Sequence, residues 1–362
     1  MSRSDLSQFV INGLKCFFRC IFTGNPGILT NYRDSRYNNG MRIHIPNSAF
    51  LGNIDPFLRG FDPSSPEKLE ITANQKWIAV HPVVLSMIAA LGLSVKRESI
   101  ICEKLEARSA HYLQRMGLTK ILGVHSEAPI VEHEAAGRFI PITQIKSSDE
   151  LSDFIADMIP LLHLEEKQSE TIGYIVSELV RNVLEHADSE NGACLCAQYY
   201  KKSNSIRIGI ADAGIGIKKA INQSHAAADD LRAIGLALTP GITGTTSNEG
   251  GTAQNAGAGL FFIKSIASIN RDYLLIYSGS GFYKLLRKPL SAKTKFRLHA
   301  DPFKDRNSGD NTFPRWAGTV VGVDITLDQT SEFSALLDAI RLTYSKTVKD
   351  RKRAKYKKPR FL

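Results

Sequence analysis

Three stretches of this sequence decide its fold: SELVRNVLEHA at 177–187, ADAGIGI at 211–217 and NAGAGLFFIK at 255–264. The first has a helical pattern, because apolar residues recur at intervals of three and four around it. Glu178, Asn182 and His186 share a second face of that helix, since residues four apart on a helix are neighbours. The spacing therefore predicts a polar site where a carboxylate and an amide can converge on one metal ion or one water molecule.

The other two stretches combine glycines with a strand and with a helix. Asp212 ends SIRIGIAD, in which isoleucines alternate with polar or small residues as they do in a strand. The glycines that follow allow backbone conformations and close ligand approach that a side chain would hinder. Gly257 and Gly259 precede a helical pattern, and a glycine turn that leads into a helix directs unpaired backbone N–H groups at an anion such as a phosphate.

In order and spacing, the three stretches resemble the N-box, G1 box and G2 box of the GHKL ATPase superfamily, the Bergerat fold of gyrase, the ninety-kilodalton heat-shock chaperones, histidine kinases and MutL proteins. The resemblance covers roughly residues 165–330. It implies an α+β protein with a two-layer α/β sandwich, whose mixed sheet carries helices on one face. SELVRNVLEHA is most similar to the anti-sigma serine kinases, in which a Glu, an Asn and a His-Ala end recur in the same helix.

The resemblance also implies ATP and Mg²⁺ as cofactors and assigns roles to individual residues. Glu178 would orient or deprotonate a water molecule, Asn182 would hold the magnesium ion, and Asp212 would accept a hydrogen bond from the adenine amino group. Thr319, in a GT pair before the family's last strand, would help to seat the adenine. The implied ATP-binding set is Asn182, Asp212, Gly214, Gly216, Ile217, Thr252, Gly257, Ala258, Gly259, Leu260 and Thr319.

A stretch rich in Gly, Thr and Asn lies at 239–256, where the superfamily has its mobile ATP lid. We expect it to order over bound nucleotide, and the alternative is a surface loop with no gating role. The sequence contains no GxxxxGK[ST] motif and no GxGxxG that opens a helix after a first strand, so the Walker and Rossmann types of nucleotide site are excluded.

Strand and helix patterns alternate between residues 41 and 145, which predicts a smaller α/β domain with a mixed or parallel sheet. MRIHIP, KLEITA and SIICEK have strand patterns, and HPVVLSMIAALG and ARSAHYLQRMG have helical ones. The arrangement is weakly similar to STAS domains of bacterial partner-switching regulators, although their serine motif is missing. The predicted divisions are an N-terminal amphipathic helix and linker at 1–40, this domain at 41–145, the ATP-binding domain at 146–330, and a C-terminal helix and basic tail at 331–362.

Composition limits the class of protein and its partners. The chain has 362 residues, 43% of them hydrophobic, and a net charge of +10, of which residues 346–360 contribute nine basic side chains against Asp350. Such a block is usually solvated and disordered, and binding of nucleic acid or anionic lipid and a merely solubilising role remain alternatives. The five cysteines form no CxxC pair, which favours a cytoplasmic protein.

The apolar segment FVINGLKCFFRCIF at 9–22 is too short to span a membrane and contains Lys15 and Arg19. We expect an amphipathic helix that docks on the protein itself or on a partner, and a homodimer is open. Three functions fit the whole sequence: an ATPase that acts as a conformational switch in a bacterial regulatory system, a serine/threonine kinase of the anti-sigma type that acts on a protein partner, and a nucleotide-dependent binding module with negligible turnover.

Overall fold

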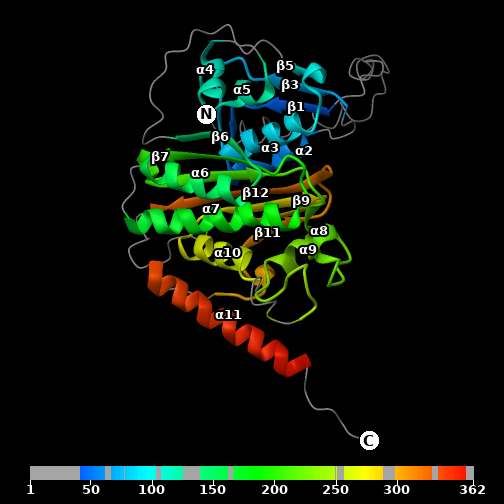
Figure 1. The fold of residues 1–362 in the computed structure, drawn as a ribbon, viewed down its shortest axis with the longest axis vertical. Helices are drawn as coiled ribbons and strands as arrows, with labels where there is room; N and C mark the ends of the chain where they lie inside the picture. Colours follow the sequence, from blue (N-terminus) through cyan, green and yellow to red (C-terminus); the bar gives the residue numbers. More distant parts are fainter. Residues whose placement is uncertain are drawn as a thin grey trace, which may run out of the picture. The chain divides into compact units, whose positions relative to one another are not determined.

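A seven-stranded sheet forms the centre of the predicted ATP-binding part, in the order β11-β10-β9-β12-β8-β7-β6 (Figure 1). Every neighbouring pair in it is antiparallel, whereas a mixed sheet was predicted. The parallel strand pairs of the described residues lie in the segment before it, at residues 41–102. The helices together with this antiparallel sheet confirm the predicted α+β class. The strands are β6 (Phe139–Ile145), β7 (Ala193–Tyr200), β8 (Ser205–Ala211), β9 (Leu274–Gly279), β10 (Gly281–Leu285), β11 (Asn307–Asp310) and β12 (Trp316–Thr326).

The computed structural model describes residues 41–61, 67–76, 78–102, 107–124, 139–161, 166–248, 250, 257–287, 298–327 and 333–355. The helix predicted at 9–22, Thr252 and the basic residues after 355 lie outside the described residues. Residues 40–362 belong to one compact unit. The described helices include none with the length and continuous apolar surface that crossing a bilayer requires.

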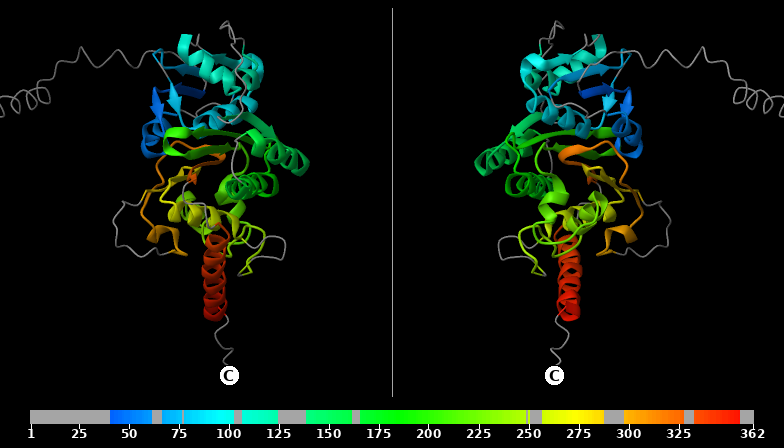
Figure 2. Two further views of the ribbon diagram at one scale, coloured as in Figure 1. Left: turned by 90° about the vertical axis from the view of Figure 1, so that its left-hand side faces the viewer. Right: turned by 90° about the vertical axis from the view of Figure 1, so that its right-hand side faces the viewer.

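One face of the seven-stranded sheet packs against helices from the predicted ATP-binding part itself. Alternate residues of β8, among them Ile206, Ile208 and Ile210, point to this face and join a core with Val176 and Ile263. The helices of this part are α6 (Ser148–Leu161), α7 (Glu166–His186), α8 (Gly216–Ile221), α9 (Asp230–Ala237) and α10 (Gly259–Ile269). The predicted layer of helices on one face is therefore present, with α7 and α10 at its centre (Figures 1 and 2).

The opposite face of this sheet is covered by α3 (Pro82–Leu93), which comes from the preceding segment. Residues 82–92 of α3 are all buried, because the helix is apolar on every side and has to pack between two layers. Gly209 of β8 and Gly322 of β12 lie beneath it, and a side chain at Gly209 would meet the backbone of Val83 at 2.1 Å. The sequence predicted this helix but not its place on the sheet.

A small parallel sheet, β1-β3-β5, lies on the far side of α3 (Figure 1). All three of its strands were predicted from their patterns, and so were the helices α3 and α4. The elements of this segment are β1 (Met41–Ile45), β2 (Ser48–Ala49), α2 (Asp55–Arg59), β3 (Leu69–Ala73), β4 (Ala79–Val80), β5 (Ile100–Cys102), α4 (Ala107–Arg115) and α5 (Leu118–Leu122). Strand β6 then pairs with β7 and completes the larger sheet, while the likeness to STAS domains stays a prediction.

The last described element is α11 (Phe333–Lys355). Residues 346–355, which the sequence suggested were part of a solvated and disordered tail, form the last turns of this helix. Burial explains the difference, since Ile340 and Val348 are 0% and 8% exposed and pack against the body of the protein. The basic residues of this segment are therefore displayed on a helix.

Candidate functional site

A cavity of about 700 Å³ opens on the face of the seven-stranded sheet that carries α7 and α10. It is lined by ten of the residues that the sequence analysis selected: Glu178, Asn182, Asp212, Gly216, Ile217, Gly257, Ala258, Gly259, Leu260 and Thr319. They come from stretches that are far apart in the sequence, and the fold brings them together around one space. Gly214 does not line the cavity, and Thr252 is outside the described residues.

Helix α7 forms one wall of the cavity. Its buried stripe, which includes Leu179 and Val183, faces the sheet and so turns Glu178 and Asn182 toward the cavity, one helical turn apart. The side-chain nitrogen of Asn182 is buried and has no hydrogen-bond partner among the described residues. Burial raises the pKa of Glu178 above its ordinary value, and the nearby charge of Arg181 opposes that rise. This wall therefore offers a basic carboxylate and an amide with unused hydrogen-bonding capacity.

Asp212 lies at the end of β8, and only 1% of its surface is exposed. Its Oδ1 accepts a hydrogen bond of 2.8 Å from the backbone N–H of Gly214, whereas its Oδ2 has no partner among the described residues. Burial raises the pKa of Asp212 to about 7, although the backbone hydrogen bonds of Gly214 and Thr319 oppose the rise. A buried acceptor that lacks a donor is costly, and Oδ2 lies where a ligand N–H group in the cavity could donate to it.

Gly214 packs closely against the residue that follows α7 and so positions the carboxylate of Asp212. A Cβ atom at this position would lie 2.0 Å from the carbonyl oxygen of Ala187, the residue that follows α7. The N–H of Ile215 donates to the same carbonyl over 2.7 Å. Only glycine therefore lets the turn after β8 press against the end of α7, and that contact orients Asp212.

Ser278 of β9 is a positioning residue beside the cavity that the sequence did not reveal. Its hydroxyl accepts a hydrogen bond of 2.9 Å from the N–H of Ile217 and donates one of 2.6 Å to the carbonyl of Gly318. It thereby joins the turn after β8 to the start of β12, where Thr319 pairs with Ser278 in the sheet. No local motif marks this serine, because its role depends on the pairing of β9 with β12.

The other end of the cavity is formed by the start of α10. Gly257 has a φ of +63°, and a Cβ atom there would lie 2.4 Å from the carbonyl oxygen of Ile242. A Cβ atom at Gly259 would lie 2.2 Å from Oε2 of Glu178, so α10 begins in direct contact with that carboxylate. Ala258 caps the helix without a side-chain hydrogen bond. The first N–H groups of a helix have no partner within the helix, so those of α10 are suited to bind an anion in the cavity.

A family model described as the histidine kinase-like ATPase domain matches residues 145–269. This range runs from the end of β6 to the end of α10 and contains α7, Asp212 and the glycines of the cavity. The chain contains a histidine kinase-like ATPase domain. A domain of this kind binds ATP, and the predicted membership of the GHKL superfamily is confirmed, while the anti-sigma kinase subtype stays a prediction. No curated protein matches the chain.

The ATPase domain has further cavity residues that its three motifs do not mark. Lys219 of α8 and Arg181 of α7 bring positive charge to the cavity, and Arg181 is paired with Glu185 over 3.1 Å. Thr243 and Thr245 line it from the predicted lid at 239–256, of which residues 239–248 and 250 are described. His186 also lines the cavity, where its Nε2 lies 3.9 Å from Oε2 of Glu185.

The donor set of the ATPase domain suits magnesium that arrives with a nucleotide. The described residues contain no group of three or more His, Cys, Asp or Glu side chains that forms a ready metal site. Mg²⁺ commonly takes few protein ligands and completes its shell with phosphate oxygens and water. The amide of Asn182, whose nitrogen has no partner in the described chain and whose oxygen can act as a ligand in the cavity wall, and the carboxylate of Glu178 one turn away fit that need.

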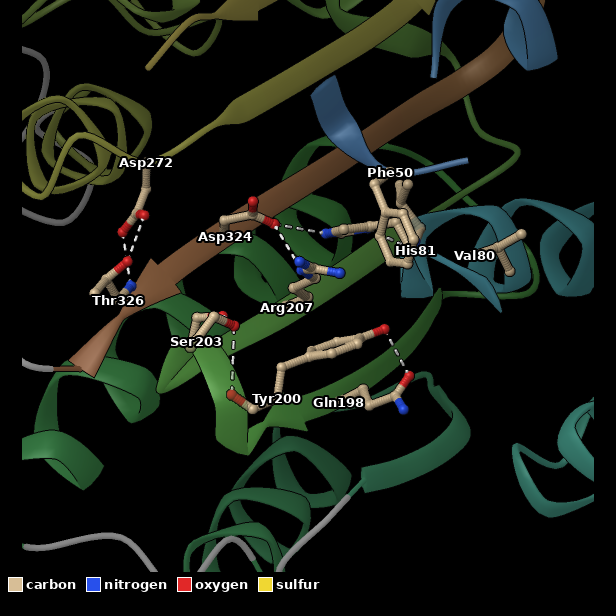
Figure 3. Close-up of polar contacts among 12 residues, drawn as sticks. Phe50, Val80, His81, Gln198, Tyr200, Ser203, Arg207, Asp272, Asp324 and Thr326 are labelled. Carbon is tan, nitrogen blue, oxygen red and sulfur yellow. Dashed lines mark hydrogen bonds and ion pairs between the residues drawn. The ribbon is translucent and has the colours of Figure 1, made fainter. Parts of the chain in front are cut away.

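The opposite face of the ATPase sheet holds a second polar cluster, centred on Asp324 of β12 (Figure 3). Arg287 donates a hydrogen bond of 3.2 Å to its Oδ2, and Arg207 and His81 lie 3.6 Å and 3.2 Å from its Oδ1. His81 caps the start of α3, where its Nδ1 accepts from the N–H of Val83, so the neutral ring carries its proton on the Nε2 that faces Asp324. Burial lowers the pKa of His81 and favours this neutral form. The cluster joins α3 to the ATPase sheet.

Proposed function

We propose that this protein hydrolyses ATP in the presence of Mg²⁺ and uses the reaction as a conformational switch in a bacterial regulatory system. The observation that carries the proposal is the contact between Glu178 and the start of α10, since it puts a basic carboxylate beside the N–H groups that suit the phosphates. The other features of the cavity supply the orientation of the nucleotide.

The adenine end of the nucleotide is proposed to lie against Asp212. Its unpartnered Oδ2 accepts the hydrogen bond of an exocyclic amino group, which a guanine in the same orientation does not offer at that position. Thr319 and the backbone of Gly216 complete this end of the cavity. Ser278 holds the two segments that carry them at a fixed separation.

The phosphate end is proposed to lie against Gly257 and Gly259. The N–H groups of the first turn of α10, which have no partner within the helix, would stabilise the negative charge that the phosphates carry. Magnesium held by Asn182 would neutralise part of the charge on the β- and γ-phosphates. Lys219, which lines the same cavity, adds a positive charge that can steer the nucleotide into the site.

Glu178 is proposed to act as the general base. Burial raises the pKa of its carboxyl group and so makes the carboxylate a stronger base for a water molecule than an exposed glutamate is. The water oxygen attacks the γ-phosphorus, the bond from that phosphorus to the bridging oxygen breaks, and the water proton passes to Glu178. The products are ADP and inorganic phosphate, whose release resets the switch.

The test is an incubation of the purified protein with Mg²⁺ and γ-labelled ATP that resolves free phosphate from labelled protein. We expect Glu178→Gln to slow phosphate release by about 10²- to 10⁴-fold, the usual contribution of a general base. Glu170→Gln is the matched control, because Glu170 is an exposed carboxylate on the same helix and does not line the cavity. Binding of a fluorescent ATP analogue, measured beside it, shows that both variants keep the site.

Three results would contradict the proposal in different ways. Unchanged release from Glu178→Gln would remove the assigned base. Label transferred to a protein side chain, here or on an added partner, would indicate a protein kinase. Tight binding with no release from the wild type would indicate a nucleotide-dependent binding module.

A further inference from the structure

Helix α11 lies outside the region that matches the family model, yet it packs on α10, which lines the cavity and packs in turn on α7. The ring centroid of Tyr344 on α11 lies 6.3 Å from that of Phe262 on α10. The centroid of Phe262 lies 6.2 Å from that of Tyr174 on α7. Ile340, which is fully buried, extends the same contact. The helix is thus anchored on α10, which carries Gly259, and through α10 on α7, which carries Glu178.

The last turns of α11 contact the loop that follows α9. Arg351 donates a hydrogen bond of 2.8 Å to the carbonyl of Pro240. Val348 lies against two glycines of this loop, since Cβ atoms at Gly241 and Gly250 would come within 2.6 Å and 3.0 Å of its methyl groups. Both glycines have positive φ, at +76° and +91°, so their backbone bends around the valine side chain.

Gly241 connects this contact to the phosphate end of the cavity. Its N–H donates to the carbonyl of Gly257 over 3.0 Å, and its carbonyl accepts from the N–H of Gly250 over 3.0 Å. The next residues, Ile242 and Thr243, line the cavity itself. A single layer of backbone therefore separates Val348 from the glycine that we place against the phosphates.

The outer face of the same turns is strongly basic. Lys346, Lys349 and Arg353 are exposed on this face, with Asp350 as the acidic residue of the stretch from 346 to 354. Lys352 lies one turn after Val348, and its Nζ approaches the loop at Gly250 instead. Over these residues the helix rises about 1.5 Å per residue, so the cations form a short row along its axis. In Figure 2 this end of α11 extends away from the sheet.

The chemistry of this face favours a nucleic acid over a membrane. A helix binds a bilayer surface through an exposed apolar stripe, and the stripe of α11 that includes Ile340 and Val348 is already buried against the ATPase domain. What the outer face presents to solvent is mainly cationic, which suits a regular row of phosphates and the release of their counterions.

We propose that a nucleic acid duplex binds the outer face of α11 and that its binding is coupled to ATP binding through the contact of Val348 and Arg351 with Pro240, Gly241 and Gly250. The proposal rests on the ATP site described above. Duplex bound to α11 would hold the helix on the loop and so stabilise the wall of the cavity, which makes the coupling positive. The same factor applies in both directions, because coupling between two binding equilibria is reciprocal.

The experiment uses the full-length chain, a fluorescent ATP analogue and a labelled DNA duplex of arbitrary sequence at low ionic strength. We expect saturating duplex to tighten analogue binding by about 5- to 10-fold, the lower part of the usual range for coupled sites. Saturating ATP should tighten duplex binding by the same factor. Val348→Ala should keep both separate affinities and abolish the coupling, whereas Leu342→Ala, which truncates an exposed leucine on the same helix, should leave the coupling intact.

Lys346→Glu combined with Lys349→Glu should abolish duplex binding and leave analogue binding without duplex unchanged. The proposal is overturned if saturating duplex leaves the analogue affinity unchanged, or if the protein binds vesicles that contain anionic lipid and not the duplex. It is also overturned if the double variant still binds the duplex. Failure of the analogue to bind under any condition would instead refute the ATP site, and the coupling with it.

Discussion

The two faces of the seven-stranded sheet use buried polar groups in opposite ways. On the cavity face, Asp212 keeps one carboxylate oxygen without a partner among the described residues. On the α3 face, Asp324 is surrounded by Arg287, Arg207 and His81. Strand β12 contributes to both, with Thr319 at the cavity and Asp324 at the cluster. The difference is one of charge: Asp324 forms ion pairs with two arginines although its Oδ1 makes no hydrogen bond among the described residues, whereas no charged side chain in that part of the chain contributes to the pKa of Asp212, which is left to a ligand.

The largest effect is expected from Asp324→Asn. Removal of the carboxylate leaves the mostly buried guanidinium of Arg207 without its counter-charge, and breaking a buried pair in this way costs about 3–5 kcal/mol of unfolding free energy. Urea denaturation measures this loss. Asp338→Asn is the control, because its pair with Arg341 is exposed and should contribute less than about 1 kcal/mol. Equal losses in the two variants would mean that the cluster does not stabilise the α3 face.

Gly209→Ala should have the next largest effect. The added methyl group would meet backbone atoms of Val83, which cannot move without shifting α3, so we expect a loss of about 2–3 kcal/mol in unfolding free energy. Gly322→Ala is the matched control on the same face, where the nearest atom is the end of the Leu51 side chain at 2.9 Å. A smaller change in its melting temperature is expected. If Gly322→Ala costs as much as Gly209→Ala, close backbone packing of α3 is not what the glycine provides.

Asp212→Asn should lower the affinity for ATP and raise the thermal stability of the protein at alkaline pH. The amide presents a donor and loses the charge, so ATP affinity should fall about 10- to 100-fold, the range for a hydrogen bond to a charged group. Isothermal titration measures this affinity. For the wild type, the affinity should also decrease as the pH falls below about 7, where the carboxyl group takes up a proton.

The pH dependence of the melting temperature tests the ionisation of Asp212 in the protein without nucleotide. The pKa of Asp212 is about 7 in the folded protein, above its ordinary value, so ionisation disfavours the folded state. The contribution of this carboxyl to stability is therefore present at low pH and is lost as the pH rises toward and through about 7. The amide side chain of the Asp212→Asn variant does not ionise, hence this variant should melt at a higher temperature than the wild type at alkaline pH, and the difference should shrink in acid. An equal difference at all pH values would contradict the shifted pKa.

The smallest effect is expected from Ser278→Ala. This change removes the two hydrogen bonds that join Ile217 to Gly318, and a loss of about 1 kcal/mol in holding the adenine end lowers the ATP affinity by about fivefold. Fluorescence titration with the ATP analogue measures the change. Ser152→Ala, on the exposed side of α6, is the control and should leave the affinity unchanged. An unaltered affinity for Ser278→Ala would show that the two segments hold the adenine end without the serine.

Much of the candidate site was predictable because its signals are local. Helical spacing brings Glu178 and Asn182 to one face, and the glycines mark where backbone must approach its neighbours closely, as Gly214 and Gly259 do. The strands β1, β3 and β5 and the helices α3 and α4 were predicted for the same reason, since their patterns of apolar residues repeat within each element. The shorter elements β2, β4, α2 and α5 were not predicted. These local patterns do not indicate which helix or strand packs against which other one.

The parts that were not predicted all depend on such long-range choices. The fully antiparallel order of the larger sheet, the position of Ser278 beside Thr319, and the burial of Val348 that keeps α11 helical arise from contacts between segments distant in the chain. The position of α3 is the clearest example. Its surface is apolar on every side, which requires burial between two layers, but the sequence does not indicate which two layers these are.

The sequence by itself determined the nucleotide-binding motifs, the class of the fold and the elements that carry them, because each rests on spacing within about twenty residues. Only the tertiary structure decided that one face of the sheet would line the cavity and the other would bind α3, and that the basic end of α11 would lie against the loop beside Gly257. The physical reason is that burial and hydrogen bonding are satisfied by contacts among all the elements at once, and no single stretch of sequence specifies its partners.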